Sequence, residues 1–148
     1  MDDGPSQFLA LEVVYRDEHM IELAASFSFA EWTAYSKAYT QPECVCEFVD
    51  ELEQFARRLS GEASFAAGLT GRAGFLFLKF YTVGGSRSLF CNFEMIAEPL
   101  EPLEPREGSI LSKVSVELPF EAAALDTFVA ALRRIAETQL GKAALRVS

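Results

Sequence analysis

The chain has 148 residues, enough for one domain with a sizeable hydrophobic core, so we expect a single domain over residues 1–148. Its 13 Lys and Arg residues against 22 Asp and Glu residues give a formal net charge of -9, which disfavours nucleic acid and anionic membranes as partners and favours a basic protein. Three cysteines, an acidic first stretch without a signal peptide and the lack of a long apolar run predict a cytoplasmic protein.

Two strands joined by a polar turn begin the predicted fold. Residues 8–15 are rich in apolar and β-branched side chains, and residues 20–29 would form their hairpin partner. Asp17, Glu18 and His19 lie between the two strands. Because three consecutive side chains at a turn diverge, and His19 is the only histidine, we interpret this cluster as a solvated turn rather than a metal or acid–base site.

Residues 28–40 fit two secondary structures. Trp32, Tyr35 and Tyr39 recur at helical spacing, whereas a strand would place Tyr35 and Tyr39 on one face and Trp32 on the other. The aromatic enrichment favours the strand. Each of the three side chains combines a large apolar area with a polar group, which makes them candidate partner-binding residues, although ordinary packing is the simpler interpretation.

The first amphipathic helix is predicted after Thr40. Thr40 and Glu43 have the spacing of a capping box, Pro42 stands in the first turn, and apolar residues recur at three and four positions up to Gly61. Residues 65–69 then have the composition of a short strand.

The longest apolar run, residues 74–83, is followed by Gly84-Gly85 and by a second strand over residues 86–96. A two-residue glycine loop would fix the register of this hairpin and give it one apolar and one half-polar face. We therefore predict a central strand beside a more exposed one. The expected cross-strand pairs are Val83 with Ser86, Phe80 with Leu89, Leu78 with Cys91 and Leu76 with Phe93.

Residues 97–108 form a connector rich in Pro and Glu. A Glu-Pro pair recurs every three residues, so a polyproline II helix would align Glu98, Glu101 and Glu104 along one edge. A solvated spacer is the simpler interpretation. The alternative is an acidic edge that binds a partner.

A strand over residues 110–120 and a second amphipathic helix, which opens at Pro119 and stops at Gly141, complete the predicted elements. The two helices resemble each other, since Leu52-x-x-Phe55-Ala56-x-x-Leu59 is similar to Leu125-x-x-Phe128-Val129-x-x-Leu132. The flanking strands do not align at that spacing. We therefore interpret the match as two helices with the same packing problem rather than as a duplication.

Together the elements predict an α+β fold, in which a mostly antiparallel sheet of about six strands carries two amphipathic helices packed on it. No Ser/His/Asp, Cys/His or metal-ligand arrangement is found, and Cys44 with Cys46 lacks the second half of a zinc site. We therefore expect no catalytic residue, no cofactor and no metal, and a protein that is not an enzyme.

Several of these stretches resemble one family. They are Phe48-Val49-Asp50-Glu51-Leu52 with Phe55 and Leu59, Glu62-Ala63, the Gly84-Gly85 hairpin, and Leu118-Pro119-Phe120 leading into the second helix. This order is similar to that of the WapI-type immunity proteins, which are bacterial antitoxins. The resemblance implies a protein that binds and neutralises a cognate toxin domain without catalysis. The alternatives are a small-ligand-binding or housekeeping domain and, as a weaker one, a hydrolase.

Overall fold

The computed structural model describes residues 7–68, 74–84, 88–97 and 112–148. This part of the chain contains eight strands and two helices. The elements follow one another as β1 (Phe8–Arg16), β2 (Ile21–Phe29), β3 (Trp32–Thr40), α1 (Pro42–Arg58), β4 (Glu62–Ala67), β5 (Phe75–Val83), β6 (Ser88–Ile96), β7 (Lys113–Phe120), α2 (Ala122–Thr138) and β8 (Lys142–Arg146).

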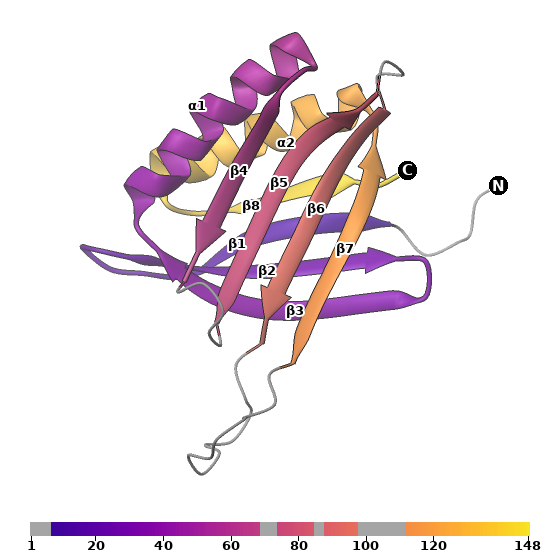
Figure 1. The fold of residues 1–148 in the computed structure, drawn as a ribbon. Coiled ribbons are helices and arrows are strands. Elements are labelled where there is room, and N and C mark those ends of the chain that lie inside the picture. Colours follow the sequence, from indigo (N-terminus) through magenta and orange to yellow (C-terminus); the bar gives the residue numbers. More distant parts are fainter. Residues whose placement is uncertain (1–6, 69–73, 85–87, 98–111) are drawn as a thin grey trace, which may run out of the picture.

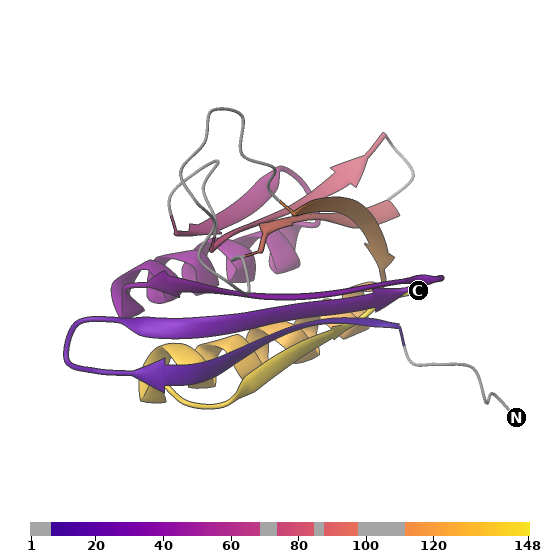
Figure 2. The same cartoon turned by 90° about the horizontal axis from the view of Figure 1, so that it is seen from below.

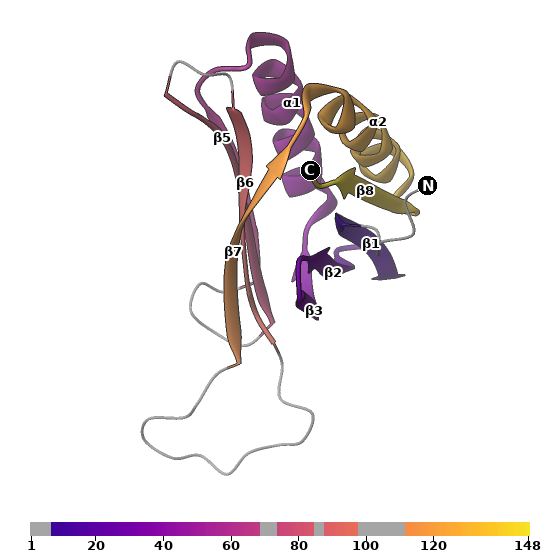
Figure 3. The same cartoon turned by 90° about the vertical axis from the view of Figure 1, so that its right-hand side faces the viewer.

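The strands form two antiparallel sheets of four strands each. Sheet 1 has the order β3-β2-β1-β8, and sheet 2 has the order β4-β5-β6-β7. The two sheets cross each other (Figure 1), and both helices and sheet 1 lie on the same side of sheet 2 (Figure 3). The predicted α+β class and the two helices are confirmed. The prediction had about six strands in one sheet, and the described residues form eight strands in two sheets of four.

The fold is an internal repeat of two similar halves. Each half consists of three antiparallel strands, a helix and a fourth strand, namely β1 to β4 around α1 and β5 to β8 around α2. In each half the fourth strand joins the sheet of the other half, since β4 pairs with β5 and β8 pairs with β1. The two halves thus exchange their last strands, as the two subunits of a domain-swapped dimer do, but within one chain.

The halves also correspond in sequence at buried positions. Both helices end in a left-handed residue, Leu59 and Gln139, and each is followed two positions later by a glycine with positive φ, Gly61 and Gly141. The buried residues of the helices correspond as Val45 to Leu125, Phe48 to Phe128, Val49 to Val129, Leu52 to Leu132 and Phe55 to Ile135.

The structure therefore corrects the interpretation that the helices are alike without being part of a repeat. The sequence comparison paired Leu52 with Leu125, whereas the structure pairs Leu52 with Leu132. This shift is about two helical turns, and such a shift leaves the same face of the helix apolar. The correct alignment is recognisable only from the strands and glycines that flank the helices.

A cluster of phenylalanines fills the space between the layers. The ring of the fully buried Phe80 on β5 lies 6.1 Å from Phe48 on α1, 5.9 Å from Phe128 on α2 and 5.6 Å from Phe120 on β7, measured between ring centroids. Both helices thus contact the same side chain of sheet 2, Phe80. Sheet 1 joins this core through Phe27, whose ring lies 5.7 Å from that of Phe93 on sheet 2.

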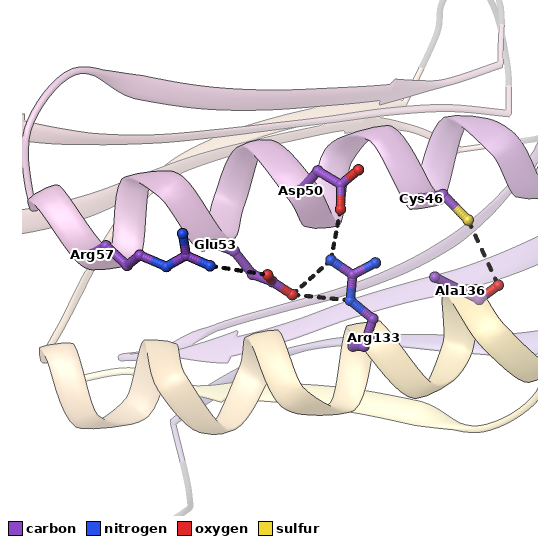
Figure 4. A network of polar contacts seen from close by, with 6 residues as sticks. All are labelled: Cys46, Asp50, Glu53, Arg57, Arg133 and Ala136. Carbon is purple, nitrogen blue, oxygen red and sulfur yellow. Dashed lines mark hydrogen bonds and ion pairs between the residues drawn. The ribbon is translucent and has the colours of Figure 1, made fainter.

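The two helices are also joined by charged groups (Figure 4). The guanidinium of Arg133 on α2 donates from Nε to Glu53 Oε1 at 2.9 Å and from Nη2 to Asp50 Oδ1 at 2.7 Å. Glu53 also lies 3.8 Å from Arg57. Glu53 and Arg133 are corresponding positions of the two halves, so this ion pair spans the junction of the repeat.

The register of the β5–β6 hairpin differs from the predicted one by two residues. Val83 lies opposite Ser88 and Phe80 opposite Cys91, so the connection is longer than Gly84-Gly85. The predicted apolar face is nevertheless correct, because side chains alternate with a period of two and a two-residue shift returns each one to its face.

Three boundaries also differ from the prediction. Gln41 rather than Thr40 precedes α1 and makes no side-chain cap, so the capping box was wrong, although Pro42 does open the helix. Pro119 lies inside β7, an edge strand, where its missing N–H can face away from the ladder. Strand β8 was not predicted at all, because its buried side chains are only Ala143 and Leu145.

Candidate partner-binding face

The predicted aromatic residues lie on β3, an edge strand of sheet 1, so residues 32–40 form a strand as favoured. Tyr35 and Tyr39 are 61% and 43% exposed and point away from the core. Trp32 is 67% exposed, but it lies opposite Phe29 on the other side of the strand. The structure therefore brings Tyr35 and Tyr39 onto one face and leaves Trp32 off it.

A third tyrosine joins this face because β1 contains a β-bulge. The register shifts between Val13, which lies opposite Leu23, and Tyr15, which lies opposite Glu22. Without the extra residue Val14, Tyr15 would follow the inward-pointing positions 9, 11 and 13. The bulge instead turns Tyr15 outward, which is a common use of bulges. Its ring packs edge-to-face against that of Tyr39, with centroids 6.4 Å apart.

We define the outer face of sheet 1 as this tyrosine set together with the outward residues of the neighbouring strands. Its centre is made of small side chains, since Tyr35 lies opposite Ser26, Ser26 opposite Ala10, and Ala10 opposite Ala144. Neither α1 nor α2 covers this face when the molecule is seen from below (Figure 2). The result is a sheet surface with small side chains at its centre and exposed tyrosine rings on β3 and near the end of β1.

Asp17 fixes the turn beside the tyrosines. Its Oδ1 accepts hydrogen bonds from the backbone N–H groups of His19 and Met20, both at 2.8 Å, and its Oδ2 accepts one from the Tyr15 hydroxyl at 3.2 Å. The bonds from His19 and Met20 hold the pKa of Asp17 below its ordinary value, and the bond to Asp17 raises the pKa of Tyr15. The solvated turn predicted from the sequence is thus confirmed, and it orients Tyr15.

Carboxylates surround the tyrosine end of the outer face. Glu22 lies between Tyr15 and Tyr39, directly opposite both. A surface hollow of about 530 Å³ adjoins it and is lined by Arg16, Asp17, Glu18, Pro42, Glu43 and Gln139. The guanidinium of Arg16 donates to the Thr138 carbonyl at 3.0 Å and so turns toward the end of α2. Glu22 and Asp17 thus place carboxylates beside the aromatic rings, whereas the hollow lies toward the ends of the two helices.

A second hollow, of about 660 Å³, lies between the start of α2 and β8, the edge strand of sheet 1 opposite to β3. Small and polar side chains dominate its wall, and Arg146 is its one cationic residue among those that the structure describes. Its lining comprises Gln7, Glu121, Ala123, Ala124, Thr127, Ala144, Arg146, Val147 and Ser148.

No group of three or more potential metal ligands occurs among the residues the structure describes. Cys44, Cys46 and Cys91 are free thiols, and burial raises the pKa of Cys91 far above its ordinary value. In the described ranges, neither helix is long and apolar enough to cross a membrane. The predicted acidic edge of Glu98, Glu101 and Glu104 lies outside the described residues.

Sequence reasoning found Tyr35 and Tyr39 but missed Tyr15 and Glu22. A β-bulge has no sequence signal of its own here, and without it the alternation of β1 assigns Tyr15 to the core. The search for similar proteins adds no residues to this set, because no family model, no curated protein and no solved structure matches the chain.

Proposed function

We propose that this protein is an immunity protein of the WapI type, which binds a cognate toxin domain and neutralises it without catalysis. The observation that carries the proposal is the outer face of sheet 1, where three tyrosines are 43% to 61% exposed over a floor of Ala and Ser residues. Exposed tyrosines are frequent anchors of protein interfaces, because they bury a large area at low entropic cost.

The charge of the chain supports a basic partner. A net charge of -9 attracts a basic domain over long range and repels nucleic acid. Toxin domains that attack nucleic acid need basic surfaces around their active sites, so an acidic binder that covers such a surface blocks substrate access. Glu22 and Asp17 place carboxylates beside the tyrosine rings, where they steer a basic partner toward the aromatic anchors.

The test uses a candidate toxin domain taken from the genes that neighbour the gene of this chain. The purified toxin domain and the purified protein are mixed in equal amounts, and both the affinity and the toxin activity are measured at low and high salt. We expect binding that weakens as salt rises and inhibition that follows occupancy. Absence of binding, or binding that leaves the toxin fully active, would contradict the immunity function.

The face itself is tested by a matched pair of variants on one strand. Tyr35→Ala removes an exposed aromatic ring from the outer face, and Trp32→Ala removes one from the opposite side of the same strand. Loss of a true anchor costs about 2 kcal/mol or more of binding free energy. Tyr35→Ala should therefore weaken toxin binding much more than Trp32→Ala, and the reverse order would place the interface elsewhere.

A further inference from the structure

The repeat allows the outer faces of the two sheets to be compared position by position. Tyr15 lies opposite Glu22 in the ladder of sheet 1, and Tyr81 lies opposite Phe90 at the corresponding position of sheet 2. On its other side Tyr81 lies opposite Glu62 of β4. Each of the two tyrosines therefore has a glutamate directly across from it on a neighbouring strand.

In sheet 2, Tyr81 and Glu62 contact a cation of their own chain, Lys79. The Nζ of Lys79 lies 3.2 Å from Glu62 Oε2 and 5.8 Å from the centroid of the Tyr81 ring. This is a cation–π contact combined with an ion pair. Lys79 stands on β5 two residues before Tyr81, so its ammonium satisfies both groups at once.

In sheet 1 the corresponding cation is missing. The ladder position of Lys79, opposite Asn92, is occupied in β1 by Glu12, opposite Ala24. No ion pair to Glu22 and no cation over the Tyr15 ring is found among the described residues.

The nearby basic residues of the described chain are engaged elsewhere or lie at other positions of the ladder. Arg16 bonds to the Thr138 carbonyl, Lys142 lies opposite Glu12, and Lys37 lies opposite Ala24, diagonal to Glu22. Arg146 lies further along β8, opposite Phe8.

We propose that Tyr15, Glu22 and Tyr39 together bind a lysine or arginine side chain of a partner protein. Like the Lys79 site of sheet 2, this set places a glutamate directly across from a tyrosine ring, here on β2 instead of on the strand that corresponds to β4. The bulge at Val14 exposes the ring that a cation would contact. Glu22 supplies the countercharge, while the two rings, 6.4 Å apart, provide aromatic surface beside it. The Tyr15–Asp17 hydrogen bond holds one ring in place before binding, which lowers the entropic cost.

This inference rests on the proposed role as a partner-binding protein, but its test needs no toxin. Three blocked hexapeptides serve as probes, in which glycine alternates with lysine, with arginine or with glutamine. The full chain, isotope-labelled for NMR, is titrated with each peptide. We expect saturable shifts of the Tyr15 and Tyr39 ring protons with the lysine and arginine peptides and none with the glutamine peptide.

Variants test whether the ring-proton shifts come from binding at the row formed by Tyr15, Glu22 and Tyr39. Tyr15→Ala and Glu22→Gln should each weaken peptide binding about threefold, the size typical of one exposed cation–π contact or ion pair. Tyr15→Phe keeps the ring but loses the hydrogen bond to Asp17, so its affinity should lie between that of the unchanged protein and that of Tyr15→Ala. Lys37→Gln removes a competing cation and should tighten binding. Glu47→Gln on α1 changes the net charge equally, away from the row, and should have no site-specific effect.

Several results would overturn the inference. These are the absence of saturable ring shifts, equal shifts with the glutamine peptide, or equal losses for Glu22→Gln and Glu47→Gln. The two proposals also fail separately. If the toxin domain does not bind but the basic peptides do, the immunity function falls and the cation site stands. If the toxin binds and neither Tyr15→Ala nor Glu22→Gln weakens it or the peptides, the cation site falls alone.

Discussion

Replacing Phe80 by alanine should test the whole arrangement of layers, because this side chain contacts both helices and β7. Phe80 is fully buried, and its ring meets those of Phe48, Phe120 and Phe128. Truncation of a buried Phe to Ala costs about 3 to 5 kcal/mol, since the lost transfer free energy adds to the cavity that remains. We expect a loss of about 4 kcal/mol in the free energy of unfolding.

That loss is large against the total. A domain of this length has a free energy of unfolding of roughly 7 to 15 kcal/mol. With a urea dependence of about 2 kcal/mol per molar, the midpoint of unfolding should fall by about 2 M, with the slope unchanged. Urea titration followed by circular dichroism and by tryptophan fluorescence measures this shift and checks that unfolding is two-state.

Phe90 provides the matched control. It lies on the opposite, outer face of sheet 2, is partly exposed, and stacks on Tyr81 with ring centroids 6.1 Å apart. Phe90→Ala should therefore cost only about 1 kcal/mol. If Phe90→Ala destabilises the protein as much as Phe80→Ala, the assignment of inner and outer faces is refuted.

Three further predictions concern charged and titrating groups. Arg133→Ala should lower the free energy of unfolding by about 1 kcal/mol through loss of the bonds to Glu53, whereas the exposed neighbour Arg134→Ala should change it by less than about 0.5 kcal/mol in the same urea titration. The folded pKa of Asp17 is below its unfolded value, so its contribution to stability is full above the unfolded pKa and is lost as pH falls through the folded one. An NMR titration should find Asp17 protonating below the ordinary range, and a value at or above 3.8 would contradict the turn geometry. Burial and the hydrogen bond to a carboxylate raise the pKa of Tyr81 from 10.0 to about 12. Its contribution to stability is therefore full below pH 10 and is lost as pH rises toward 12. In an ultraviolet titration, Tyr81→Phe should remove a phenolate that forms near pH 12.

The sequence predicted which faces are buried better than it predicted which residues lie opposite each other. Phe80 belongs to the core as expected, yet its partner is Cys91 rather than Leu89. Leu52 lies on the buried face of α1 as expected, yet its counterpart in the other half is Leu132 rather than Leu125. Both errors have one cause: a periodic pattern is unchanged by a shift of one period, so it determines the face and leaves the register open.

The candidate site was predictable only in part, for a related reason. Tyr35 and Tyr39 follow the regular alternation of β3, so assigning the strand was enough to place them on one face. Tyr15 breaks the alternation of β1 at the bulge, and the pattern of apolar residues does not predict that Val14 is the extra residue. Glu22 becomes part of the site only because Tyr15 and Tyr39 lie on either side of it, and this is a property of the sheet order β3-β2-β1.

Comparing the two halves distinguishes residues that are needed for packing from residues that packing does not constrain. Positions that point inward agree, since Leu9 and Leu11 of β1 correspond to Leu76 and Leu78 of β5, and all four are buried. Positions that point outward diverge in a way that packing does not require. Sheet 2 has Lys79, Tyr81 and Phe90 in contacts with one another or with Glu62.

The outer face of sheet 1 keeps the tyrosine but differs at the neighbouring ladder positions. Glu12 replaces the lysine and Glu22 replaces the phenylalanine, while Tyr39 takes the place of Pro119 on the edge strand. Sheet 2 thus satisfies its outer aromatic and charged groups within the chain, whereas sheet 1 presents Tyr15 and Glu22 without a cation among the described residues. The same scaffold therefore carries one face whose cation comes from its own chain and one face without such a cation among the described residues, and the second is where we propose that a basic partner binds.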